Sequence, residues 1–161
     1  GRLKLKVNEA KSAVGKPHER SFLGFSIVRG GKIAVSAKAR DKLKAKIREL
    51  TSRNRGCRLS RVIGELTTYL RGWKAYFRIA TARSNLRELS AWMMRKLRCF
   101  LWKQWGGRGY RELRKRGVSR DLAWNTSKSA HGPWRISMSP ALGIALPTRH
   151  FVEMGLPLLY T

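Results

Sequence analysis

Acidic residues are scarce in this chain. Only 9 of its 161 residues are Asp or Glu, against 36 Lys and Arg, which gives a formal net charge of +27. A domain this basic repels itself, and a phosphate backbone offsets that repulsion while releasing its own condensed counterions. The shortage of acids therefore predicts a polyanionic partner, with nucleic acid ranked above a small acidic substrate.

The few carboxylates are also far apart in sequence. No DD or DxD pair and no ExxH motif occurs, and single acids stand at positions such as Glu9, Asp41, Glu49, Glu65, Glu88 and Glu112. Two-metal phosphoryl transfer needs carboxylates clustered tightly enough to hold two ions about 4 Å apart. We therefore expect these acids to be surface ion-pair partners, and we name no catalytic residue.

Metal-binding residue types are equally sparse. Cys57 and Cys99 lack the CxxC or Cys/His spacing of a structural zinc site, so both are expected to be reduced thiols. His18, His131 and His150 are isolated in sequence. Each is expected to be a surface or phosphate-contacting histidine rather than part of a catalytic triad. The sequence thus predicts no metal and no cofactor in this chain.

Long apolar runs are missing too. No run approaches the roughly 20 residues needed to span a bilayer, and residues 1–6 alternate instead of forming the apolar core of a signal peptide. We therefore expect a cytoplasmic chain and no membrane partner. Basic amphipathic helices also bind anionic membrane surfaces, so charge alone leaves that alternative open.

Hydrophobic patterns that are present predict a mainly α fold with a small antiparallel β element at the N-terminus. Alternation predicts a strand at residues 3–7, an apolar run predicts another at 22–28, and Gly30-Gly31 predicts a turn into a third at 32–35. After Ser36, a good N-cap, the period becomes helical. Helices are expected at about 37–53, 59–80, 85–105, 110–115, 121–125 and 141–146.

Basic side chains interleaved with aromatics are the strongest binding feature. Residues 95–105 combine bases that suit phosphates with rings that suit unpaired bases, although Trp102 and Trp105 are expected to pack in the core. A second set, at helical spacing, would form a row on one helix face. The residues predicted to contact RNA are Arg71, Lys74, Arg78, Arg95, Arg98, Lys103, Arg108, Arg111, Arg114, Lys115, Arg116 and Arg135.

Short motifs in a defined order resemble those of group II intron reverse transcriptases. The resemblance to the end of the palm rests on three motifs: Leu5-Lys6-Val7-Asn8, Lys11-Ser12 and Phe22-Leu23-Gly24-Phe25. Three further segments resemble the maturase-specific region, which comprises the thumb and domain X. They are Leu70-Arg71-Gly72-Trp73 with Tyr76-Phe77, the helix from Trp92 to Trp105, and Gly132-Pro133-Trp134-Arg135. Each motif is short, but the ordered combination is specific and covers essentially the whole chain.

The resemblance implies a role for each region. Residues 1–36 would be the remnant of a palm, with Lys11 near the incoming nucleotide and a primer-grip hairpin formed by Phe22, Leu23, Gly24 and Phe25. Residues 37–82 would be thumb helices that follow the template–primer duplex, and residues 83–161 would be domain X, which binds group II intron RNA. The catalytic Tyr-Ala-Asp-Asp segment and its Mg²⁺ would belong to an upstream palm and fingers segment. We therefore expect no DNA synthesis by this chain alone.

Three functional hypotheses follow. The leading one is an RNA-binding thumb and maturase unit that assists intron splicing and, joined to an upstream palm, RNA-directed DNA synthesis. The alternative is a stand-alone basic RNA chaperone without intron preference. A membrane-active helical protein is the third, and the predicted strands and glycine turns argue against it. Exposed apolar strands near the N-terminus also add a homodimer to the expected partners.

Overall fold

The protein is helical over most of its length. The computed structural model describes residues 21–28 and 30–160. Its elements are β1 (Ser21–Phe22), β2 (Phe25–Ile27), β3 (Ile33–Val35), α1 (Ala37–Leu50), η2 (Arg53–Arg55), α2 (Leu59–Tyr76), α3 (Arg83–Trp105), η3 (Gly106–Arg108), α4 (Gly109–Lys115), α5 (Arg120–Lys128), α6 (Pro133–Ile136), α7 (Pro140–Ala145) and α8 (Thr148–Glu153). The predicted mainly α class is confirmed. The predicted strand at residues 3–7 and Lys11 lie outside the described residues.

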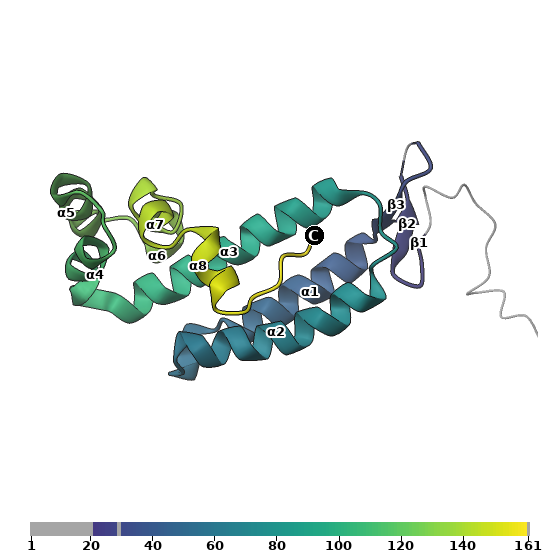
Figure 1. The fold of residues 1–161 in the computed structure, drawn as a ribbon, viewed down its shortest axis with the longest axis horizontal. Helices are drawn as coiled ribbons and strands as arrows, with labels where there is room; N and C mark the ends of the chain where they lie inside the picture. Colours follow the sequence, from purple (N-terminus) through teal and green to yellow (C-terminus); the bar gives the residue numbers. More distant parts are fainter. Residues whose placement is uncertain (1–20, 29, 161) are drawn as a thin grey trace, which may run out of the picture.

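Helix α3 is the longest element and organises the others (Figure 1). Its 23 residues extend over about 34 Å, at 1.5 Å per residue. The sheet lies near one of its ends, α4 and α5 lie at the other, and α1 and α2 run along its side. The segment after α8 returns along the bundle, where the amide of Leu159 donates to Ser90 Oγ at 3.2 Å.

The β element differs from the prediction at one point. Residues 22–28 do not form a single strand, because Phe22 pairs with Phe25 and leaves Leu23 and Gly24 as a two-residue turn. Both turn residues have positive φ, 48° and 81°, the backbone that tight hairpin turns require. The apolar side chains of this run favoured an uninterrupted strand, whereas the chain turns at its glycine. The third strand continues the antiparallel sheet in the order β1-β2-β3.

Helix α1 begins where the sequence predicts. Ser36 Oγ accepts from the amide of Ala39 at 3.3 Å, and Leu43 and Ile47 are fully buried. The helix ends at Leu50, three residues before the predicted end. There the Thr51 hydroxyl donates to the carbonyl of Ile47 at 2.6 Å, and the next turn is a 3₁₀ segment.

Helix α2 stops at Tyr76, four residues before the predicted end. The following segment leaves the helix axis because the amides of Thr81 and Ala82 both donate to the carbonyl of Ile33 on β3. The Thr81 hydroxyl in turn accepts from the amide of Ile33 at 3.0 Å. A tertiary contact with the sheet thus outcompetes the local helical tendency of residues 77–80.

One continuous hydrophobic core runs from Val35 to Leu159. The inner face of α3 is buried as predicted, at Leu86, Leu89, Met93, Leu97 and Leu101. Trp105 is buried and Trp102 packs against the core, so the expectation that both are packing residues is confirmed. Tertiary packing, rather than propensity alone, stabilises the long helices.

The remaining helices are short. The predictions at 110–115, 121–125 and 141–146 correspond to α4, α5 and α7, and Ser139 caps α7 by accepting from the amide of Leu142 at 3.3 Å. Helices α6 and α8 were not predicted, because each is too short for a hydrophobic period to stand out and neither begins at a side-chain cap such as Ser139 of α7. In the part of the chain that the structure describes, no helix is both long and apolar enough to cross a membrane.

Candidate nucleic-acid interface

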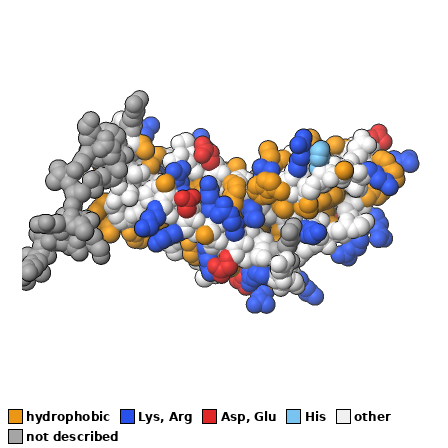
Figure 2. All heavy atoms as spheres, turned by 180° about the vertical axis from the view of Figure 1, so that it is seen from behind, with side chains coloured by type: hydrophobic (Ala, Val, Ile, Leu, Met, Phe, Trp, Pro, Cys, Tyr) orange, Lys and Arg blue, Asp and Glu red, His pale blue; other side chains and the backbone are white. Residues whose placement is uncertain are grey.

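Basic side chains are spread over the described part of the face seen in Figure 2, with few acids among them. Among the described residues, ion pairs form at Glu49, Glu65 and Glu112. These three acids are therefore ion-pair partners, as expected. Because 36 basic residues face 9 acids, most cations have no carboxylate to neutralise them whatever the pairing. The surface can thus bind phosphates without first breaking an ion pair.

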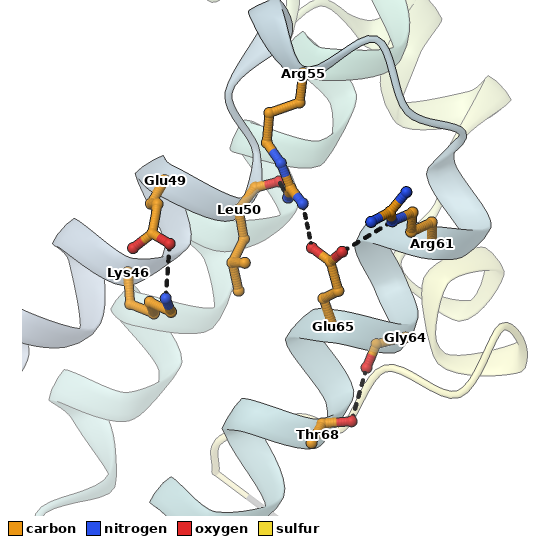
Figure 3. A network of polar contacts seen from close by, with 8 residues as sticks. All are labelled: Lys46, Glu49, Leu50, Arg55, Arg61, Gly64, Glu65 and Thr68. Carbon is orange, nitrogen blue, oxygen red and sulfur yellow. Dashed lines mark hydrogen bonds and ion pairs between the residues drawn. The ribbon is translucent and has the colours of Figure 1, made fainter.

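Glu65 closes the connection between α1 and α2 (Figure 3). Its Oε2 lies 2.7 Å from an amino nitrogen of Arg55, and its Oε1 lies 3.1 Å from Nε of Arg61. Arg55 also donates to the carbonyl of Leu50 at 2.8 Å. The hydrogen bond from Arg55, then that from Arg61, lowers the pKa of Glu65. These cations hold the fold and are poor candidates for RNA contact.

The predicted row Arg71, Lys74 and Arg78 does not form one helix face. Arg71 and Lys74 lie on α2, but Arg78 lies in the turn that follows its last residue. Lys74 and Arg78 instead share a hollow of about 130 Å³ with Arg83 and the apolar side of Tyr160. The backbone turn therefore brings cations of two successive helices together.

Two half-buried arginines of α3 donate hydrogen bonds to neighbouring segments of the protein. Arg98 donates through Nε to the carbonyl of Leu146 at 3.0 Å, and burial lowers its pKa. The guanidinium of Arg95 lies 3.8 Å from the ring centroid of Trp134 and donates to that residue's carbonyl at 3.0 Å. Arg98 therefore fastens α3 to the end of α7, and Arg95 fastens it to α6.

The basic cluster around α4 divides into two kinds of residue. Arg116 pairs with Glu112 and lies 4.7 Å from the Trp105 ring centroid, and its hydrogen bond lowers the pKa of Glu112. Arg114 donates to the carbonyl of Val118 at 2.6 Å. Arg108 and Arg111 are exposed. Arg108 and Arg111 are thus the candidates for phosphate contact, together with exposed Lys103, whereas exposed Lys115 lies 4.0 Å from Glu112.

An exposed tryptophan beside this cluster was missed in the sequence. Trp124 on α5 is 53% exposed, its ring stands edge-on to Tyr110 at 6.0 Å, and Lys128 Nζ lies 4.8 Å from its centroid. In a short amphipathic helix a tryptophan resembles a core residue, so only the packing distinguishes it. An exposed ring with a lysine beside it is a suitable surface for stacking an unpaired base.

The hairpin turn places apolar side chains in solvent. Phe22 and Leu23 are 77% and 65% exposed at its tip. The carbonyl of Leu23 accepts from the Tyr76 hydroxyl at 3.0 Å, and Phe25 stacks on Tyr76 at 5.8 Å. Gly24 has its Cα within close reach of Phe77, since an added Cβ would lie 3.2 Å from that ring. The end of α2 therefore holds the predicted primer-grip residues in a fixed turn.

Histidines and cysteines do not converge. Across residues 21–28 and 30–160, no group of three His, Cys, Asp or Glu side chains is placed to hold a metal ion. Cys57 and Cys99 are half-buried and do not form a disulfide. His131 does join Arg95 and Arg135 at one pocket, which the sequence did not bring together.

Comparison with known families identifies one region of the chain. Residues 40–117 match the family model for the group II intron maturase-specific domain. The match extends from α1 through α4 and therefore includes helices predicted as thumb and the first part of the predicted domain X. The boundary proposed at residues 82 and 83 stays a prediction. A comparison with curated proteins gives no match.

Proposed function

We propose that the chain binds group II intron RNA and thereby assists splicing, because residues 40–117 match the family model for the group II intron maturase-specific domain. The observation that carries the proposal is the exposed basic surface of the matched helices. Arg71 on α2 and Arg108 and Arg111 around α4 all face solvent within residues 40–117. Phosphate contacts of this kind position an RNA, and its folded shape supplies the selectivity.

Exposed rings support a second element of binding. Trp124 lies next to the α4 cluster, because α5 packs against α4 through the Tyr110–Trp124 contact. Phosphates on α4 and an unpaired base on Trp124 would therefore belong to one RNA segment. Such a combination suits loops and bulges better than regular duplex, whose bases are already stacked.

We also propose that the chain works with an upstream palm in RNA-directed DNA synthesis. The exposed Phe22–Leu23 tip and the basic residues of α1 and α2 are suited to a template–primer duplex. Any Mg²⁺ for that reaction would be held by the upstream segment. An apolar hollow of about 490 Å³, lined by residues such as Phe22, Ile27 and Ile79, is available for that segment or for a second copy. The cytoplasm is the proposed site of action.

The test is a binding titration with a folded group II intron RNA over a series of salt concentrations. An unrelated structured RNA of the same length serves as the competitor. A preference of tenfold or more, about 1.4 kcal/mol, supports the maturase function. Equal binding of both RNAs, with equal weakening in salt, would instead favour the alternative of a basic RNA chaperone without intron preference.

A charge-reversal variant sharpens this test. Replacing Arg108 and Arg111 by Glu should weaken binding and reduce the slope of log K against log salt, by about 0.7 to 0.9 for each phosphate that is no longer neutralised. The control is Arg149→Glu, an exposed arginine on α8 outside residues 40–117, and it is compared with each single replacement, Arg108→Glu and Arg111→Glu, which changes the net charge equally. If Arg149→Glu weakens binding as much as either of them, net charge rather than this surface determines the affinity.

A further inference from the structure

A pocket of about 540 Å³ lies between α3, α5 and α6. The residues relevant here are Arg95, Asn125, His131, Arg135, Ile136 and Met138. Its volume falls within the range of about 300 to 1,000 Å³ that is usual for small-molecule sites. We infer that this pocket binds one unpaired nucleotide of an RNA, an inference that rests on the proposed RNA-binding function and makes it specific.

The charge of the pocket suits a phosphate. Arg95 and Arg135 line it from two different helices, and His131 adds a third nitrogen-bearing side chain. None of the described residues that line it is Asp or Glu. A guanidinium presents several N–H donors in a planar fork that matches phosphate oxygens. The pocket therefore offers cations to an anion and no carboxylate to repel it.

Arg95 is held in place before any ligand arrives. Its guanidinium stacks on Trp134 at 3.8 Å, its terminal nitrogen donates to the Trp134 carbonyl at 3.0 Å, and its Nε donates to Ser137 Oγ at 3.4 Å. These two hydrogen bonds use two of the five N–H groups of an arginine. The side chain thus keeps donors for a phosphate and loses little rotamer freedom on binding.

The other walls suit a nucleobase. Met138 is 67% exposed, and Ile136 is buried behind the pocket, so part of the wall is apolar. A thioether makes favourable contacts with aromatic rings. Asn125 is exposed on α5 and carries one amide donor group and one acceptor, the pair needed to read the edge of an unpaired base. The cationic side of the pocket thus suits the phosphate of a nucleotide, and the apolar side with its amide suits the base.

A bulged nucleotide fits this pocket better than a base-paired one. In an A-form helix each base is stacked on its neighbours and hydrogen-bonded to its partner, so it cannot enter a separate pocket. A bulged or looped base is already free of both constraints. The pocket should therefore distinguish RNAs that are identical except for one unpaired nucleotide.

The experiment compares two RNA hairpins that differ only by a single bulged uridine, using the full chain. We expect wild type to bind the bulged hairpin about tenfold more tightly, the size of one base-stacking contact. Arg135→Gln should lose this preference while keeping its affinity for the plain hairpin. Arg149→Gln, the matched control on α8, should keep both the preference for the bulged hairpin and the affinity for the plain one. Equal binding of the two hairpins by wild type overturns the pocket inference and leaves RNA binding intact, whereas no binding of either contradicts the proposed function itself.

A cross-linking measurement supplies an answer that does not depend on a variant. The bulged uridine is replaced by 4-thiouridine, irradiated in the complex, and the attached peptide is identified by mass spectrometry. Attachment at Arg95 or within residues 125–139 is expected. Attachment only at other residues overturns the inference. A separate competition experiment uses an octaglutamate peptide. If this peptide displaces the bulged hairpin but not the plain one, the pocket is a peptide site and the inference is overturned.

Discussion

Substitution of Gly109 by alanine should destabilise the protein, although alanine is the better helix former. Gly109 is buried at the start of α4, and an added Cβ would lie 2.8 Å and 3.0 Å from two ring atoms of Trp102. Removing glycine from a helix ordinarily stabilises by about 0.5 to 1 kcal/mol. Forcing an extra methyl group into packed surroundings costs about 1 to 3 kcal/mol. The packing cost is larger, so a net loss of about 1 to 2 kcal/mol is expected.

The measurement is thermal unfolding followed by circular dichroism. For a domain of this size a loss of 1 to 2 kcal/mol corresponds to a fall in Tm of roughly 2 to 8 °C. Gly64→Ala is the matched control, because Gly64 lies within α2 and no atom would meet an added Cβ there. It should raise Tm instead. The combination of Gly109→Ala with Trp102→Phe should recover part of the loss, since the smaller ring leaves room for the added methyl group. A raised Tm for Gly109→Ala itself would refute the reasoning.

Three further predictions concern an ion pair, a cap and a stacking surface. The pKa of Glu65 is lowered in the folded state, so its contribution to stability is present above the unfolded value of about 4.3 and is lost as the pH falls through the folded pKa. Glu65→Gln should therefore lower Tm at pH 7, and this loss should shrink as the pH is lowered below about 4; a loss that stays the same at every pH would contradict this account. Ser36→Ala should cost about 1 kcal/mol in urea unfolding, because the amide of Ala39 loses its acceptor, while an unchanged midpoint would show that the cap is dispensable. Trp124→Ala should weaken binding of single-stranded RNA about tenfold, with Trp124→Phe intermediate and Tm unaffected; equal affinities in fluorescence anisotropy would exclude stacking at this ring.

The long helices could be read from the sequence because their signals are local and repeated. Leu43 and Ile47 in α1, and Met93 and Leu97 in α3, recur at the helical period and are all buried. The ends of these helices were less predictable. Helix α2 stops early because residues 81 and 82 bond to Ile33, which is 48 positions away from Thr81. No local pattern carries such a contact.

The candidate interface likewise has features that the sequence predicts and features that depend on tertiary packing. Net charge allows a class of partner to be predicted, since it depends only on composition, and that prediction stays to be tested by RNA binding. It did not reveal which cations the protein uses for itself, because Arg98 reaches the carbonyl of Leu146, 48 positions away, and Arg95 reaches Trp134, 39 positions away. The pocket that joins Arg95 to Arg135 likewise depends on how α3, α5 and α6 pack. Trp124 could have been noticed as a ring within a basic segment, but its exposure could not.

The return of residues 151–159 along the bundle has a consequence for synthesis on the ribosome. Phe151, Leu156 and Leu159 are buried in the same core as α1 to α3, and Gly155 accepts a hydrogen bond from Thr67 at 3.1 Å. The helices that are synthesised first therefore keep part of their apolar surface exposed until this late segment has been synthesised. Until then the nascent chain exposes hydrophobic surface beside a dense positive charge.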